Sequence, residues 1–297
     1  MPKVSVIIPV YNVEPYLGEA LDSVLRQTLQ DFEIIAVNDG STDGSRAILE
    51  AYRDRIRIID KPNGGQGAAR NDALKIACGD YICFLDSDDW IEPDTLQACY
   101  DLCERDNLDF TYFDAVNFGE KVLFNYSRAS IFPGVHTGPE TMCRILDSGV
   151  YACSVCMGLY RRSFLERTGV RFPEGFIHED ELYSAVCYFN ASRVEPLDRV
   201  FYHRRCHAGS TMTTTFSRRN LDGYMNVLKG LPAAVSDLPM CGDAKRKLDL
   251  NICICLMHNG WSLDFRSRSR IVLAILRRPW TFRPKPFAIL LFKKFLR

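Results

Sequence analysis

The amino-terminal third of the chain alternates between short apolar runs and segments in which apolar residues recur every three or four positions. The apolar runs occupy residues 3–10, 32–37, 57–60 and 81–85. Polar turns of a few residues connect them. Strands that alternate with helices through short turns form a right-handed, mostly parallel sheet. We therefore expect an α/β fold with a doubly wound, mostly parallel sheet flanked by helices.

The turns that follow these strands should lie together. In an open α/β sheet, ligands bind in the crevice at the carboxyl ends of the strands. We expect the crevice to be formed by residues 9–12, 39–41, 63–70 and 86–89. Gly65 and Gly67 fit part of a dinucleotide fingerprint, but Arg70 occupies the third glycine position and the motif follows the third strand. Asp39 could accept hydrogen bonds from a base or ribose, or simply stabilise a turn.

Three acids within four residues follow the last of these strands: Asp86, Asp88 and Asp89, with Ser87 between the first two. Crowded carboxylates repel one another, and a bound cation relieves that repulsion. Mg²⁺ prefers one or two carboxylates together with phosphate oxygens, so the cluster predicts Mg²⁺ or Mn²⁺ carrying a diphosphate. The alternative is that these acids form a turn and cap a helix that starts near Pro93.

The length, charge balance and cysteine count of the chain exclude some classes of protein. The chain has 297 residues, 47% of them hydrophobic, which is enough for one large domain and an appendage. Its 37 basic and 37 acidic residues cancel, which argues against a nucleic-acid partner. The first strand starts almost at Met1, leaving no room for a targeting segment, and with 12 Cys this predicts free thiols in the cytoplasm. Cys153 and Cys156 could bind a metal or act in redox chemistry, but buried small side chains explain them more simply.

A second acidic cluster opens a helix further along the chain. It contains Glu179 and Asp180 and follows a loop that contains Gly175. This arrangement suits a carboxylate at the edge of a pocket, although acids in a first turn also complement the helix dipole. A basic loop at 203–207 could meet phosphates or be solvated surface charge. His178, His203 and His207 are weaker candidates for ligand contact.

The remaining elements are less regular. Strands are expected at 108–118 and 154–160, and residues 216–297 form a helical region that follows a catalytic domain of residues 1–215. From Arg266 onward the chain has ten Lys or Arg and no acid, together with Trp and Phe. That composition suits contact between 266–297 and the anionic inner face of a cell membrane, or a helix docked on the core. No apolar run is long enough to span a bilayer.

Six motifs occur in the order that characterises one enzyme family. The chain resembles the family-2 inverting glycosyltransferases of bacterial capsule, exopolysaccharide and cell-wall polymer synthesis. The motifs cover about residues 3–215 and are Val6-Ile7-Ile8-Pro9-Val10-Tyr11-Asn12, Asn38-Asp39-Gly40-Ser41-Thr42-Asp43, Asn63-Gly64-Gly65 with Ala69-Arg70-Asn71, Phe84-Leu85-Asp86-Ser87-Asp88-Asp89, His178-Glu179-Asp180, and Tyr202-x-x-Arg205 with Gly209-Ser210.

The resemblance implies a GT-A type fold, a UDP-sugar donor and a saccharide or lipid-linked saccharide acceptor. It implies that the nucleobase and ribose contacts include Pro9, Tyr11, Asp39 and Arg70, with Asn12 and Gly40 in the same donor-binding motifs. By the same resemblance, Asp86, Ser87 and Asp88 hold the metal and diphosphate, and Asp88 is the direct ligand. Asp180 is the implied catalytic base with Glu179 beside it, and Arg205 contacts the diphosphate.

One segment departs from the family pattern. Many relatives carry Trp-Asn-Lys where this chain has Cys156-Met157-Gly158, so the resemblance does not identify the acceptor. Two other classes of protein remain open from the sequence. One is a dinucleotide-dependent oxidoreductase, which would bind NADH without metal. The other is a catalytically silent sugar-nucleotide-binding scaffold of a polysaccharide assembly complex.

Overall fold

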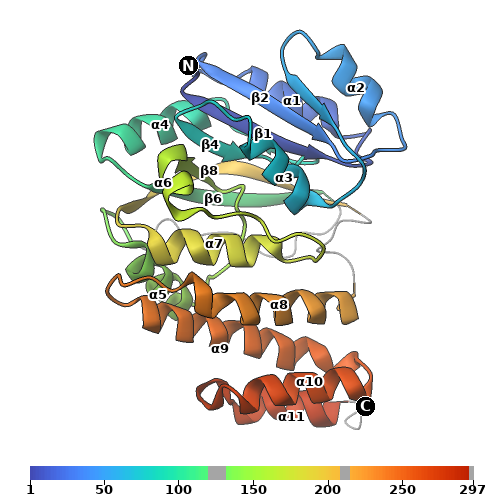
Figure 1. The fold of residues 1–297 in the computed structure, drawn as a ribbon, viewed down its shortest axis with the longest axis vertical. Helices are drawn as coiled ribbons and strands as arrows, with labels where there is room; N and C mark the ends of the chain where they lie inside the picture. The colour runs from blue at the N-terminus through green and yellow to red at the C-terminus, as the bar shows by residue number, and fades with distance from the viewer. Residues whose placement is uncertain (120–131, 208–214, 294–297) are drawn as a thin grey trace.

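A computed structural model describes residues 1–119, 132–207 and 215–293. Within these ranges, eight strands form one sheet in the order β3-β2-β1-β4-β7-β6-β8-β5 (Figure 1). The strands are β1 (Val4–Val10), β2 (Phe32–Asn38), β3 (Arg57–Asp60), β4 (Tyr81–Phe84), β5 (Trp90–Ile91), β6 (Phe110–Gly119), β7 (Gly158–Arg161) and β8 (Val194–Cys206). The Gly209-Ser210 motif lies outside the described residues.

The sheet has two halves of different construction. Strands β3, β2, β1 and β4 are all parallel. In the other half, β7 runs antiparallel to both β4 and β6, β8 is parallel to β6, and β5 is antiparallel to β8. The predicted α/β sheet with flanking helices is therefore confirmed. Its first half is wholly parallel, and its second half is mixed.

The strands of the parallel half form for the expected reason. Every residue of β1 is buried, which suits a Val- and Ile-rich parallel strand covered on both faces. One later strand is shorter than predicted. Residues 154–157 do not join β7, because the Ser154 hydroxyl accepts a hydrogen bond from the Cys156 amide at 3.2 Å and forms a local turn. None of the 12 Cys residues forms a disulfide.

The helices lie beside and below the sheet (Figure 1). Those of the first part are α1 (Leu17–Leu25), α2 (Ser45–Ala51), α3 (Gln66–Leu74), α4 (Thr95–Arg105), α5 (Gly138–Ser148), α6 (Arg162–Thr168) and α7 (Glu179–Asn190). The carboxyl-terminal ones are α8 (Arg218–Ala234), α9 (Cys241–Asn259), α10 (Phe265–Leu276) and α11 (Pro284–Phe292), with short 3₁₀ turns η3 (Gly260–Ser262) and η4 (Pro279–Thr281).

The predicted carboxyl-terminal helical region is present and continues the layering of the fold. Helix α8 contacts α7, and α9 contacts α5, so both lie against helices that cover the sheet. Helices α10 and α11 lie at the end of the molecule farthest from α2 (Figure 1). In the described part of the chain, no helix combines the length and apolar character needed to cross a bilayer. The division into residues 1–215 and 216–297 stays a prediction.

Candidate active site

Hydrogen bonds join the turns after the first strands. The Asn12 amide donates to Ser41 Oγ at 3.2 Å, and the Thr42 amide donates to Asn12 Oδ1 at 2.8 Å. Gly40 has a φ of 75°, and a side chain there would place its Cβ 2.9 Å from the Asn63 nitrogen. Only glycine adopts that conformation readily, and only glycine fits the space. The predicted convergence of these turns at one edge is confirmed.

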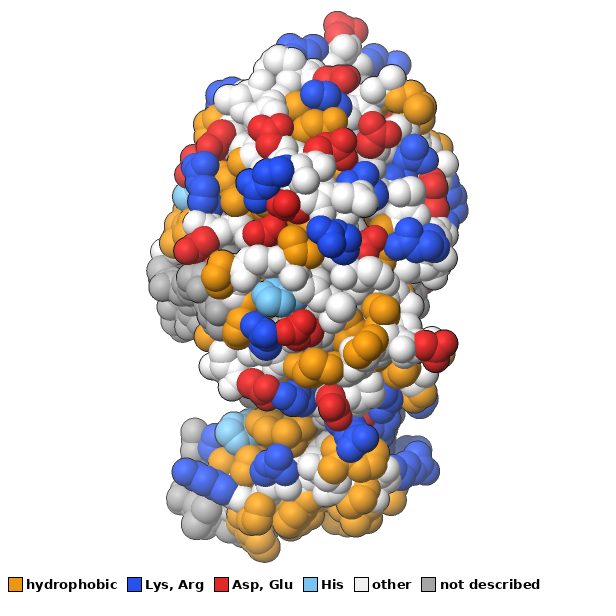
Figure 2. Space-filling model, turned by 90° about the vertical axis from the view of Figure 1, so that its left-hand side faces the viewer, with side chains coloured by type: hydrophobic (Ala, Val, Ile, Leu, Met, Phe, Trp, Pro, Cys, Tyr) orange, Lys and Arg blue, Asp and Glu red, His pale blue; other side chains and the backbone are white. Residues whose placement is uncertain are grey.

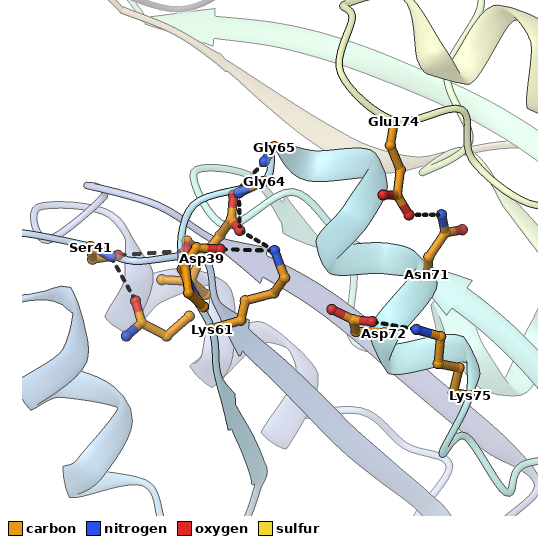
Figure 3. Close-up of polar contacts among 12 residues, drawn as sticks. Asp39, Ser41, Lys61, Gly64, Gly65, Asn71, Asp72, Lys75 and Glu174 are labelled. Atoms are coloured by element: carbon orange, nitrogen blue, oxygen red, sulfur yellow. Dashed lines mark hydrogen bonds and ion pairs between the residues drawn. The ribbon is translucent and has the colours of Figure 1, made fainter.

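Asp39 is the centre of this turn network. Its Oδ1 accepts hydrogen bonds from Lys61 Nζ and the Gly64 amide, each at 2.8 Å, and its Oδ2 accepts one from the Gly65 amide at 2.8 Å (Figure 3). The residue is 2% exposed. Asp39 thus fixes the loop that leads into α3. Its contact with a base or ribose stays a prediction, as do the roles of Pro9, which is buried in β1, and Tyr11, which is 48% exposed.

Arg70 on α3 connects the two acidic clusters. Its guanidinium donates to Asp86 Oδ1 at 2.7 Å and to Glu179 Oε1 at 3.0 Å, and the side chain is 3% exposed. Burial alone would lower the pKa of Arg70, but the Asp86 and Glu179 charges raise it, so the group stays cationic. Arg70 Nε has no hydrogen-bond partner among the described residues. The structure therefore places the two predicted clusters on opposite sides of one buried cation.

The three acids after β4 have different environments. Asp89 is buried, accepts a hydrogen bond from the Tyr202 hydroxyl at 2.6 Å and accepts another from the Arg205 amide at 2.7 Å. It ties the turn to β8. The side chains of Asp86 and Asp88 remain 28% and 25% exposed. Helix α4 begins at Thr95 with Asp94 at its N-cap, so the three acids do not cap it.

Crowding raises the affinity of this turn for positive charge. Burial raises the pKa of Asp88 and the Asp86 charge raises it further, although a hydrogen bond with His207 opposes the shift. Burial raises the pKa of Asp89 well above its usual range, and the charges of Asp88 and Asp86 raise it further. No group of three or more His, Cys, Asp or Glu side chains could hold a metal within the described ranges. Two carboxylate side chains nevertheless fit Mg²⁺ or Mn²⁺, which take further oxygens from phosphate.

An arginine and a histidine lie beside Asp88. Arg205 Nε donates to the Asp88 carbonyl at 3.0 Å, and its guanidinium pairs with Glu19 on α1. His207 Nε2 lies 3.1 Å from Asp88 Oδ2. Of the three histidines weighed from the sequence, only His207 contacts a predicted site carboxylate, while His203 stacks on Trp90 with ring centroids 3.5 Å apart.

The second cluster forms the first turn of α7. Asp180 is partly exposed, and in the described structure no other side chain donates a hydrogen bond to it. Burial raises the pKa of Asp180, the Arg70 cation opposes that shift and the Asp86 charge adds to it, so the net direction is upward. Glu179 differs because Arg70 occupies its Oε1. Asp180 is therefore the carboxylate of this pair that Arg70 does not hold by a hydrogen bond.

Asn71 has a role that the sequence reasoning missed. Its Nδ2 donates to Glu174 Oε1 at 2.9 Å (Figure 3). The same Nδ2 donates to the Phe172 carbonyl at 2.9 Å, and Oδ1 accepts from the Phe172 amide. These bonds hold the loop ahead of α7 against α3. Arg70 and Asn71 are neighbours on α3, so one helix positions both the turn after β4 and the start of α7. The position of Asn71 directly after Arg70, in the same sequence motif, was the signal that could have predicted this role.

The fold and this arrangement define a GT-A type glycosyltransferase. Residues 5–169, more than half of the chain, match the model of glycosyl transferase family 2. The chain is 34% identical over 266 residues to the uncharacterized glycosyltransferase EpsJ of Bacillus subtilis, covering 86% of this chain and 75% of that protein. The protein therefore belongs to glycosyl transferase family 2. This membership decides against the dinucleotide-dependent oxidoreductase.

Cell-wall polymer enzymes are among the relatives. The poly(ribitol-phosphate) beta-N-acetylglucosaminyltransferase TarS of Staphylococcus aureus is 31% identical over 224 residues, which cover 73% of this chain and 38% of TarS. The crystal structure of TarS 1–349 in complex with UDP-GlcNAc superposes with a TM-score of 0.76 at 25% identity, covering 97% of this chain and 84% of that one. The likeness thus extends through the carboxyl-terminal helices.

Proposed function

We propose that this glycosyltransferase moves a sugar from a UDP-sugar to a hydroxyl of a saccharide or lipid-linked saccharide, with inversion at the anomeric carbon. The observation that carries the proposal is the Arg70 bridge between Asp86 and Glu179. It holds the turn that bears Asp88 and the helix start that bears Asp180 beside one another. A diphosphate site and a general base are thereby available to one substrate.

The donor half of the site is supported by the turn network and by the TarS complex with UDP-GlcNAc. In the proposal, Pro9, Tyr11, Asn12, Asp39 and Gly40 line the uridine site. The Asn12 and Gly40 turns are already fixed by hydrogen bonds and close packing, so little ordering is required when the nucleoside binds. Arg70 acts in this proposal mainly by holding Asp86 and Glu179, since its guanidinium is buried between them.

The diphosphate half uses Asp86, Ser87 and Asp88. Asp88 and Asp86 would hold Mg²⁺ or Mn²⁺, which when bound supplies positive charge to the leaving diphosphate. Arg205 lies against the Asp88 carbonyl and can exchange its Glu19 partner for a phosphate oxygen. His207 shares a hydrogen bond with Asp88 and orients that carboxylate. Each of these groups acts on the charge that develops as the glycosidic bond to phosphate breaks.

Asp180 is the proposed general base. It would accept the proton of the acceptor hydroxyl as the oxygen attacks the anomeric carbon from the side opposite the diphosphate. The upward shift in its pKa makes it a stronger base than an ordinary aspartate. The amino terminus of α7 still favours its anionic form. Glu179 supports this arrangement by anchoring α7 to Arg70.

A screen of sugar nucleotides tests the proposal. The purified protein is incubated with UDP-, GDP- and dTDP-sugars, with Mn²⁺ or with chelator, and release of the nucleoside diphosphate is measured. Slow, metal-dependent hydrolysis of a UDP-sugar is expected even without acceptor. Tight UDP-sugar binding with no release would favour the catalytically silent scaffold. Release from GDP- or dTDP-sugars alone would overturn the assignment of uridine.

We further place the enzyme in the cytoplasm, in contact with the inner face of the cell membrane through residues 266–297. The absence of disulfides among its 12 cysteines supports this location. Residues 294–297 lie outside the described ranges. A lipid-linked acceptor would be presented at the same face.

A further inference from the structure

Helix α10 presents an apolar face to solvent. Phe265 is 80% exposed, Leu273 is 52% exposed and Leu276 is 69% exposed. At about 100° per residue these three side chains fall within a quarter turn of one another, so they form one stripe along the helix. The opposite side carries Ile271 and Ile275, which are buried against the rest of the protein. The exposed stripe is therefore the outer face of a helix whose opposite face is already buried against the protein.

Other large apolar side chains are exposed on the turn that follows α10 and on α11. Trp280 in η4 is 46% exposed, Phe282 is 45% exposed and Phe292 at the end of α11 is 54% exposed. Figure 2 shows hydrophobic side chains gathered at the lower end of the molecule, surrounded by Lys and Arg, with acidic side chains higher on the same face. Exposed large apolar side chains that gather in this way mark an interaction surface.

Positive charge borders the stripe. Arg266 and Arg277 follow Phe265 and Leu276 and lie along its edge, and Lys285 is exposed on α11. None of these three cations has a carboxylate partner in the part of the chain that the structure describes. After Asp264 the sequence contains no acid. The surface therefore combines aromatic and aliphatic side chains with cations that are free to meet negative charge.

We propose that the outer face of α10, η4 and α11 docks on a bilayer that contains anionic lipid. Trp, Phe and Leu would enter the headgroup boundary while Arg and Lys meet lipid phosphates. A second copy of the chain is a poorer occupant, because a two-fold interface would bring these like charges against each other. The inference deepens the membrane contact proposed above for residues 266–297 by assigning it to this face, and it rests on the proposed function in placing a lipid-linked acceptor at the same membrane.

Vesicle sedimentation tests the docking surface. The full-length protein is mixed with vesicles of phosphatidylcholine alone, or of phosphatidylcholine with phosphatidylglycerol. We expect at least about tenfold stronger binding to the anionic vesicles, falling as salt is raised. The double variant Leu273→Glu and Leu276→Glu should bind them at least about tenfold more weakly. Both side chains point to solvent, so the variant should keep the melting temperature of the parent.

Matched controls separate this proposal from its alternatives. Val200→Glu changes another aliphatic side chain, 48% exposed on β8, and should leave vesicle binding unchanged. Equal binding to neutral and anionic vesicles, or an unaffected double variant, would overturn the proposal. A dimer that the double variant dissociates, without vesicle binding by the parent, would assign the face to a second copy. Vesicle binding without turnover of any sugar nucleotide would leave the docking surface intact and reject the donor assignment instead.

Discussion

Two regions of the molecule, the sheet and the carboxyl-terminal helices, contain ion clusters of opposite composition. Near the sheet, one cation, Arg70, lies between the carboxylates of Asp86 and Glu179. In the helical region one carboxylate, Asp249, lies between Lys245 at 2.6 Å and Arg278 at 3.2 Å. Asp249 is completely buried, and Arg278 also donates to the Leu228 carbonyl at 2.7 Å. Both clusters join segments that are distant in sequence.

The two clusters differ in how accessible their carboxylates are. Around Arg70 there are further acids, Asp88 and Asp180, which stay partly exposed and whose pKa values are raised. Around Asp249 the carboxylate is completely buried, and its two partners, Lys245 on α9 and Arg278 after α10, have side chains that are 19% and 16% exposed. A cluster with accessible carboxylates suits ligand binding and proton transfer, whereas a cluster built around a fully buried carboxylate stabilises helix packing. We therefore expect substitutions near Arg70 to change activity, and substitutions near Asp249 to change stability.

The largest expected effect is at Asp180. Asp180→Asn removes the proposed base but keeps the size of the side chain. Transfer should fall by about 10²- to 10⁴-fold because general-base assistance is lost, while UDP-sugar binding stays nearly unchanged. Single-turnover transfer and calorimetric donor binding measure the two quantities. Asp72→Asn, on the exposed side of α3 beside Lys75, is the matched control. Unchanged turnover in Asp180→Asn would remove the assignment.

The next largest effect should be a loss of stability in the other cluster. Asp249→Ala leaves Lys245 and Arg278 without their buried partner. The free energy of unfolding should drop by about 3 kcal/mol, because an uncompensated charge is costly in a buried site. Urea denaturation measures the change. Asp243→Ala, an exposed acid in the same helix, should change it little. A large loss of donor affinity in folded Asp249→Ala protein would contradict the contrast between the clusters.

Glu181 lies between the two regions and should make stability depend on pH. Burial and the Asp180 charge raise its pKa to about 8 from a usual 4.5, although the Tyr151 hydroxyl donates to it at 2.7 Å. Between pH 4.5 and about 8, Glu181 is ionised in the unfolded chain but stays protonated in the folded protein. The free energy of unfolding therefore falls as pH rises through this range. Glu181→Gln should therefore gain roughly 2 kcal/mol over the parent at pH 8.

Denaturation at several pH values checks this sign. The advantage of Glu181→Gln should shrink toward pH 4.5, where unfolded glutamate also retains its proton. An advantage that is the same at every pH would show that packing, not ionisation, separates the two proteins. Tyr151→Phe serves as a second variant, because it removes the donated hydrogen bond and keeps the ring.

The smallest effect is expected on UDP affinity when Asp88, one of the two proposed metal ligands, is removed. Asp88→Ala should weaken Mn²⁺-dependent UDP binding by about tenfold, since Asp86 and the diphosphate remain as ligands. Calorimetry with Mn²⁺ and with chelator measures the difference. Asp101→Ala removes an exposed acid from α4 and should bind UDP like the parent. Equal metal dependence in Asp88→Ala and the parent would show that Asp88 is not a ligand.

The local pattern of apolar and turn-forming residues predicted the parallel half of the sheet well. Its strands are short and uniformly apolar, its helices have regular hydrophobic spacing, and its turns contain Gly, Asn and Asp, so each signal lies within a few residues. The structure confirms the meeting of the Asn12 and Ser41 turns. The antiparallel insertion of β7 between β4 and β6 was not predicted, because strand pairing depends on partners far away in the chain.

The sequence by itself determined the strand and helix alternation, the positions of both acidic clusters and the basic, aromatic composition of the last segment. Only the tertiary structure decided which side chains meet. Arg70 and Glu179 are 109 positions apart, and Asp89 was assigned to bonds with Tyr202 and the Arg205 amide instead of to a ligand. The physical reason is that burial and ion pairing are properties of the assembled core, so no local pattern contains them.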